Sequence, residues 1–231
     1  MRVILSFLVV LGVVVSLLRA AEPKPAEPKP AEAKPAEAKP PAEPKVLFED
    51  TFEGKLADGW TWLREDANTW RIRDGALEIR VEPGVAPTVK NALRRKAPEP
   101  GLGKVAIEVT VVFTAKPTNQ YEQAGITWYH EDKPVFKLVH ENIEQNHAAQ
   151  TYIIPGRKPT DTLAVDLRLV LDGEKFQAQY RPAGQGEFQT AAEGKLPRGA
   201  DDMVSIQCYN GPANAEHWIR FDNFRILQLA P

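Results

Sequence analysis

Residues 120–142, QYEQAGITWYHEDKPVFKLVHEN, contain the alternation that decides the fold. Apolar or half-polar residues that suit a core occupy every second position on both sides of a turn predicted at 130–134. These positions are Ala124, Ile126, Trp128, Phe136, Leu138 and His140. A period of two places successive side chains on opposite faces of a strand. The stretch therefore predicts a β-hairpin with one face on a core and the other on solvent or a ligand.

The opposite face of this hairpin carries Gln123, Tyr129, Lys137 and Glu141. A sugar presents C–H faces that stack on aromatic rings, and its hydroxyls need charged or amide partners. We therefore predict an oligo- or polysaccharide site formed by these four side chains and Arg94. The competing interpretation is an exposed Lys137–Glu141 ion pair, which contributes little free energy.

The same period continues through the rest of the chain. Strands are expected near 46–52, 77–81, 105–113, 163–171, 176–180, 204–208 and 218–227. Asp74-Gly75 and Asp172-Gly173 are turn signals between such runs. We expect loops at 153–162 and 194–201, and a loop or a sharply bent connection at 142–150. Many short strands without a helical period predict an all-β fold, a sandwich of two antiparallel sheets.

Two segments of different composition precede this domain, which we place at 46–231. Residues 1–20 combine Arg2, a long apolar run and Ala20, which predicts a cleaved secretory signal; an uncleaved anchor is the alternative. Residues 21–45 repeat Ala, Glu, Pro and Lys and predict a disordered, extended linker. The expected location is outside the cell, in the periplasm or at the cell envelope, with no membrane span after cleavage.

Composition limits the partners. The formal net charge of −2 gives no electrostatic footprint for nucleic acid. Cys208 is the single cysteine and alternates with Val204 and Ile206, so a buried thiol without an intrachain disulfide is expected. We expect a monomer.

Evidence for catalysis or a metal is weaker. The Glu-x-Asp-x-x-Glu strand of many glucanases is absent, and no two histidines have the spacing of a zinc motif. A glycoside-modifying enzyme would use Glu122 or Glu141 with His140, although the alternation favours a half-buried, hydrogen-bonded structural histidine. No cofactor is predicted. A structural Ca²⁺ remains open, with Glu49, Asp50 and Asp222, or Asp201-Asp202, as ligands.

Several motifs occur in the order found in one known group. They are Trp60-x-Trp62, Trp70, Asp74-Gly75 before Leu77-x-Ile79, the 121–141 hairpin and the closing FDNFRI at 221–226. The chain resembles the concanavalin A-like domain appended to family 43 β-xylosidases, the stand-alone domain-of-unknown-function family 1349 and, at its close, laminin G-like domains. This resemblance implies a jelly roll with a concave face and carbohydrate as the first ligand class.

Three functions follow from this resemblance and the residues together. The favoured one is an exported, non-catalytic sugar-binding module. The first alternative is a hydrolase of the 3-keto-glycoside or a related class, whose members share the opening Phe and the closing Asp-Asn-Phe. The second is a structural or protein-interaction module of the cell envelope.

Overall fold

The computed structural model describes residues 43–145 and 148–230, and the side chains of 145–149 are not described. The predicted signal sequence at 1–20 and all but the end of the predicted linker at 21–45 lie outside the described residues. The first strand begins at Lys45, one residue before the predicted start of the domain.

Strands dominate the described residues, with two short 3-10 turns. The elements are β1 Lys45–Asp50, β2 Thr61–Leu63, β3 Trp70–Arg73, β4 Ala76–Arg80, η1 Ala86–Thr88, β5 Ala92–Lys96, η2 Pro100–Leu102, β6 Val105–Phe113, β7 Gln123–His130, β8 Lys133–Gln145, β9 Ala148–Ile154, β10 Lys158–Thr160, β11 Ala164–Asp172, β12 Lys175–Pro182, β13 Gln189–Lys195, β14 Met203–Tyr209 and β15 Trp218–Gln228. None of the described helices is long and apolar enough to cross a membrane.

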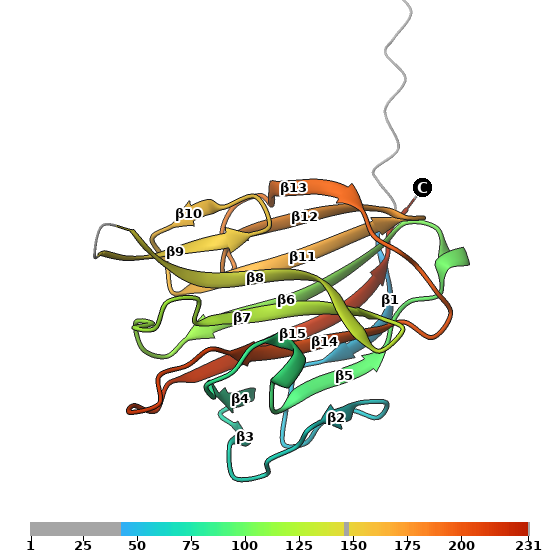
Figure 1. Cartoon of the computed structure of the whole chain (residues 1–231). Coiled ribbons are helices and arrows are strands. Elements are labelled where there is room, and N and C mark those ends of the chain that lie inside the picture. Colours follow the sequence, from blue (N-terminus) through green and yellow to red (C-terminus); the bar gives the residue numbers. More distant parts are fainter. Residues whose placement is uncertain (1–42, 146–147, 231) are drawn as a thin grey trace, which may run out of the picture. The chain divides into compact units, whose positions relative to one another are not determined.

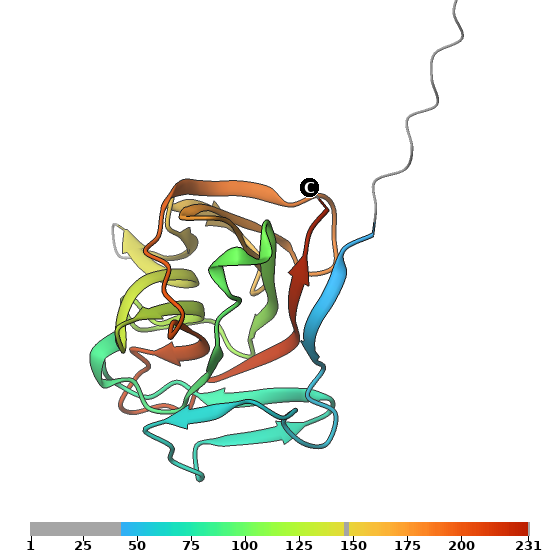
Figure 2. The same ribbon diagram turned by 90° about the vertical axis from the view of Figure 1, so that its right-hand side faces the viewer.

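The strands form two antiparallel sheets, which confirms the predicted all-β sandwich (Figure 1). The eight-stranded sheet has the order β13-β12-β11-β6-β15-β4-β3, and β1 pairs with β15. The seven-stranded sheet has the order β10-β9-β8-β7-β14-β5-β2. In Figure 2, β1 (blue) runs beside β15 (red), so strands from the two ends of the domain are neighbours.

The core lies between the facing sides of the sheets. The even-numbered residues of the β7–β8 hairpin point into it, as predicted: Ala124, Ile126, Trp128 and Leu138 are completely buried. From the other sheet, the odd-numbered leucines of β11 meet them. Cys208 is a buried free thiol, as expected. Because the even positions fill the core, the odd positions of the hairpin must project from the opposite side of the sheet.

Two-residue turns fix the register of the hairpins. Asp74 and Gly75 both have positive φ, at 49° and 68°, and join β3 to β4. Glu131 and Asp132 have φ of 49° and 58° and join β7 to β8. Positive φ at both central positions is the geometry whose twist matches that of the flanking strands. The turn between β7 and β8 is thus tighter than the predicted 130–134.

Two predicted loops are wrong. The 142–150 segment continues β8 to Gln145 and enters β9 at Ala148, with Glu144 opposite Ala149. The 153–162 segment contains the end of β9 and the short strand β10. Both segments are polar because their strands approach the edge of the sheet. There the backbone is held by hydrogen bonds to a neighbouring strand and does not need alternating apolar side chains. In 194–201, only the first two residues belong to a strand.

Candidate functional site

A row of polar residues crosses the outer face of the seven-stranded sheet. Lys137 lies opposite Thr127 on the neighbouring strand, and Thr127 lies opposite Ser205. Ser205 in turn lies opposite Arg94. Side chains opposite each other on adjacent strands share a face and contact one another. Lys137 and Arg94 therefore stand on one surface, with two small hydroxyl residues between them.

Gln123 and Glu141 occupy another row of the same face and lie opposite each other. The Lys137 ammonium connects both, because its Nζ donates to Gln123 Oε1 at 2.7 Å and to Glu141 Oε2 at 2.7 Å. Gln123 Nε2 completes the chain by donating to the Tyr121 carbonyl at 2.8 Å. The predicted Lys137–Glu141 pair is therefore real, with the Glu141 side chain 5% exposed and that of Lys137 33% exposed.

Tyr129 lies beside these rows and is 2% exposed. Its hydroxyl donates to Gln207 Oε1 at 2.9 Å, and the same oxygen accepts a hydrogen bond from Ser205. The Arg94 guanidinium carbon stands 5.5 Å from the centre of the Tyr129 ring. Burial raises the pKa of Tyr129, although the positive fields of Arg64 and Arg94 oppose this rise.

The structure thus brings all five predicted residues to one surface. We call it the polar face: Arg94, Gln123, Tyr129, Lys137 and Glu141. The neighbouring Arg95 does not belong to this surface. Its guanidinium lies against the Phe48 ring on the other side of β5. Most of the polar face is buried, and solvent reaches it at the Lys137 and Arg94 side chains, which are 33% and 17% exposed.

Sequence reasoning missed four contributors to this surface, namely Arg64, Thr127, Ser205 and Gln207. The signal for the last two was the polar alternation within the apolar run 203–208. Two buried atoms, Thr127 Oγ1 and Gln207 Nε2, have no hydrogen-bond partner among the described residues. Such atoms cost about 1–3 kcal/mol each unless water or a ligand satisfies them.

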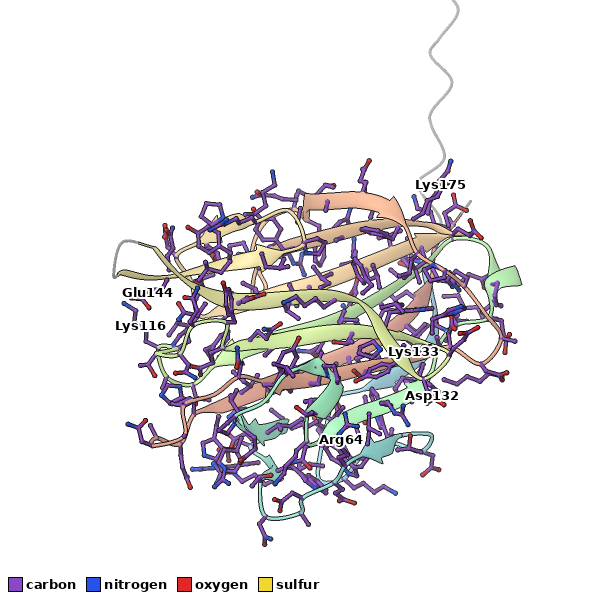
Figure 3. The ribbon with its side chains drawn as sticks, viewed as in Figure 1. Arg64, Lys116, Asp132, Lys133, Glu144 and Lys175 are labelled. Atoms are coloured by element: carbon purple, nitrogen blue, oxygen red, sulfur yellow. The ribbon has the colours of Figure 1, made fainter. Side chains whose placement is uncertain are left out.

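An apolar cluster closes one side of the polar face. Val89, Ala92 and Tyr209 are its buried members, and Leu63 and Ala86 pack against them. Ala86 belongs to η1, which Figure 1 shows in front of the seven-stranded sheet. Figure 3 shows Arg64 near η1, where its Nε donates to the Val89 carbonyl at 2.6 Å. The apolar cluster and η1 therefore lie along one side of the polar face.

The structure corrects the prediction for His140. We expected a half-buried, hydrogen-bonded ring, yet the residue is completely buried and neither ring nitrogen has a partner among the described residues. Its ring packs edge-on against Phe113 at 4.9 Å, in the core. Burial lowers the pKa of His140 to about 3. The ring points away from Glu141, so these two residues do not form an acid–base pair.

Glu122 also has a structural role. It is completely buried, and its Oε1 lies 2.6 Å from His217 Nδ1. Its Oε2 accepts backbone N–H groups of Thr118 and Asn119. These bonds fix the loop before β7 to the start of β15.

The carboxylates predicted as calcium ligands are hydrogen-bonded to other groups or lie apart from one another. Asp50 accepts two backbone N–H groups and the Trp60 indole N–H. Although β1 pairs with β15, Asp222 bonds the backbone of its own bulge. Asp202 is buried, and its oxygens bond an indole, an imidazole and a backbone N–H. No group of three or more His, Cys, Asp or Glu side chains suited to a metal occurs among the described residues.

The sandwich and its order of motifs can now be compared with known proteins. The sequence profile of the β-xylosidase C-terminal concanavalin A-like domain matches residues 49–226. The chain belongs to this family. This membership confirms the resemblance seen in the motifs from Trp60 to the closing FDNFRI. No curated protein matches the chain significantly.

Solved structures support the same fold. The GH43 BlXynB protein from Bacillus licheniformis is 20% identical over 78% of this chain, with a TM-score of 0.62. A xylan beta-1,4-xylosidase from Bacillus Halodurans C-125 is 17% identical over 84% of this chain, with a TM-score of 0.57. This chain spans only 39% and 40% of those two chains. A functionally unknown protein from Saccharomyces cerevisiae is covered over 98% of its length, at 11% identity and a TM-score of 0.50.

Proposed function

We propose that this protein is an exported, non-catalytic carbohydrate-binding module and that the polar face holds the sugar. The observation that carries the proposal is the convergence of five side chains from three strands in one surface with two cations at its rim. Membership of a family of domains appended to β-xylosidases is consistent with a carbohydrate ligand.

The hydrogen-bonding capacity left on the polar face suits sugar hydroxyls. An ammonium group has three donors, and Lys137 uses two of them for Gln123 and Glu141. Arg94 has five donors, and its one side-chain bond is a long contact of 3.4 Å to the exposed Asp132. The Tyr129 ring is too buried to stack on a sugar, so it supports the surface through its hydroxyl. Recognition would therefore depend on hydrogen bonds from the two cations.

The absence of catalysis is part of this proposal. A glycosidase needs two carboxyl groups about 5–10 Å apart, one of which donates a proton. Glu141 is the one carboxylate of the polar face as defined, and its Oε2 accepts a hydrogen bond from the Lys137 ammonium. The buried His140 points to the core and is not available as its partner. These positions favour binding over hydrolysis.

Titration calorimetry with xylo- and cello-oligosaccharides tests the proposal. Replacing both members of the pair, Lys137→Ala with Glu141→Ala, removes the central cation without leaving a buried carboxylate unpaired. We expect at least tenfold weaker binding, which is about 1.4 kcal/mol. Lys55→Ala, an exposed lysine in the connection between β1 and β2, is the matched control and should bind as the parent does.

Two results would overturn this function. One is the absence of binding to any member of a broad glycan array at millimolar concentration. The other is binding that the double substitution leaves unchanged while circular dichroism shows a native fold. Turnover of a glycan that Glu141→Gln abolishes would instead support the hydrolase alternative.

Export is the remaining element of the proposal. The apolar run in residues 1–20 and the Pro-rich repeat in 21–45 support a module secreted or displayed at the cell envelope on an extended linker. Cell fractionation with an antibody against the domain tests it, and a purely cytoplasmic signal would contradict it.

A further inference from the structure

The outer face of the eight-stranded sheet contains two clefts that the polar face does not involve. One has a volume of about 350 Å³ and is floored by β6 and β11. The other has a volume of about 520 Å³ and lies toward the opposite ends of β11 and β12. Both volumes fall within the range of small-molecule sites. We call this surface, with both clefts, the basic face.

Arginines surround the carboxylates of the first cleft. Glu108 accepts hydrogen bonds from Arg168 Nε and from Arg225 Nη2, the latter at 2.8 Å. Asp166 accepts one from Arg181 Nε at 2.8 Å. The side chains of Glu108 and Asp166 are 6% and 11% exposed, whereas the arginine side chains are 27–38% exposed. Three cations thus cover two carboxylates and leave one positive charge in excess.

Phe188 forms a wall of the same cleft. The guanidinium carbons of Arg168 and Arg181 lie 3.9 and 4.3 Å from its ring centre. The ring keeps both arginines extended, and its loop contains Gly184 and Gly186 with φ of 68° and 65°. Arginine donors that are held in place lose less entropy when they bind an oxyanion.

Lysines gather in the second cleft. Lys175 on β12 lies directly opposite Lys195 on β13, and Lys104 lines the same cleft. Figure 3 shows Lys175 projecting at the rim of the sandwich. All three are exposed, and none is in an ion pair with a described residue. Because like charges directly opposite each other are destabilising, an anion between Lys175 and Lys195 would relieve their repulsion.

Together the two clefts and the adjoining Arg168 carry six cations against four carboxylates. The cations are Lys104, Arg168, Lys175, Arg181, Lys195 and Arg225, and the carboxylates are Glu108, Asp166, Asp172 and Glu193. This local surplus of two positive charges contrasts with the net charge of −2 for the whole chain.

We infer that the basic face binds an acidic polysaccharide, extended along β12 from Arg181 to Lys175. Six residues of strand separate these two positions, which corresponds to about 20 Å. A ligand of this length would place one acidic group in each cleft. Its hydroxyls would meet acceptors and amides between them, including Gln177 and Glu193. This site is independent of the proposed function of the polar face.

The mixture of charges distinguishes an acidic sugar chain from nucleic acid. Duplex DNA carries one negative charge for about every 1.7 Å of its axis. Laid along this face, its closely spaced phosphates would also lie beside the exposed carboxylates of Asp172 and Glu193. A polysaccharide with sparse carboxylates and many hydroxyls avoids this repulsion. The carboxylate also matches the planar fork of arginine.

Calorimetry on the full chain tests the inference, with a hyaluronan hexasaccharide, in which uronic acids alternate with neutral sugars, as the probe and neutral xylohexaose beside it. We expect binding of the acidic probe that weakens at least tenfold between about 50 mM and about 500 mM NaCl, because salt screens exposed charges. The double reversal Lys175→Glu with Lys195→Glu should also weaken it at least tenfold. These lysines are exposed, so the variant should keep its fold. Lys133→Glu, an exposed lysine of the β7–β8 hairpin, is the matched control and should bind as the parent does.

Three outcomes would overturn the inference. They are no binding at millimolar probe, binding that the double reversal does not change, and equally tight binding of a DNA duplex or of dextran sulfate. The last would show a non-specific polyanion surface. A negative result in this test does not contradict the sugar site proposed on the polar face. That site is tested with neutral sugars and the Lys137 and Glu141 variants.

Discussion

The two outer faces of this sandwich share one arrangement of charges and differ in another. On both, a glutamate side chain only 5–6% exposed is paired with cations that are 29–38% exposed, Lys137 for Glu141 and two arginines for Glu108. The basic face also has exposed lysines and the exposed carboxylates of Asp172 and Glu193. The number of cations for each carboxylate differs, and so does the solvation. The comparison indicates that burial, more than residue type, separates the charges that stabilise the sheet from those that are available to a ligand.

The largest expected effect is on the basic face, at Glu108. Glu108→Ala leaves Arg168 and Arg225 together without the carboxylate between them. Losing one member of a buried ion pair typically costs 3–5 kcal/mol, and these arginines are partly exposed, so we expect a loss of about 3 kcal/mol. Urea unfolding followed by tryptophan fluorescence measures it.

Glu193→Ala, from the exposed rim of the same face, is the control and should change stability by less than about 0.5 kcal/mol. Equal losses for the two variants would break the distinction between buried and available charges on this face.

The sequence predicted the polar face better than the basic one, for a physical reason. Gln123 and Glu141 belong to one hairpin, whose register follows from a two-residue turn and a period of two. Arg168, Arg181 and Arg225 come from three strands, of which β15 joins the others through β6. Arg168 and Arg181 share a hairpin, but Glu108 lies 60 residues from Arg168 and 117 residues from Arg225 in the chain. Local periodicity does not contain these long-range pairings.

The burial of the polar face was unpredictable for the same reason. Tyr129 is covered because Gln207 and Arg94 reach it from β14 and β5. Gln207 lies 78 residues from Tyr129 in the chain, on β14, which pairs with β7. Arg94 lies on β5, which reaches Tyr129 only through its pairing with β14. His140 shows a related limit, since alternation placed it correctly inward but says nothing about partners for its nitrogens.

The next largest effect concerns acid and the seven-stranded sheet. The folded pKa of His140 is lowered to about 3, against about 6.5 in the unfolded chain. Below pH 6.5 the unfolded state therefore binds the extra proton, so stability is fully present above that pH and falls as pH decreases toward 3. The slope is about 1.4 kcal/mol per pH unit, so about 2 kcal/mol is lost between pH 6.5 and 5.

Urea unfolding at pH 7 and pH 5 measures this loss, and His140→Leu should remove most of it. Amide exchange locates it: on acidification, protection should fall first in β7, β8 and β9, before β11 and β12. Loss of protection beginning in the eight-stranded sheet would contradict the assignment to His140.

The smallest expected effect separates support from contact on the polar face. Tyr129→Phe keeps the buried ring and removes one hydrogen bond to Gln207 Oε1, which still accepts one from Ser205. The cost should be about 1 kcal/mol in unfolding free energy. Because the hydroxyl faces Gln207 and the ring is buried, sugar affinity should change less than about threefold. A loss of affinity much larger than the loss of stability would mean that the Tyr129 hydroxyl touches the ligand. The polar face would then open on binding, and its low exposure would describe only the free protein.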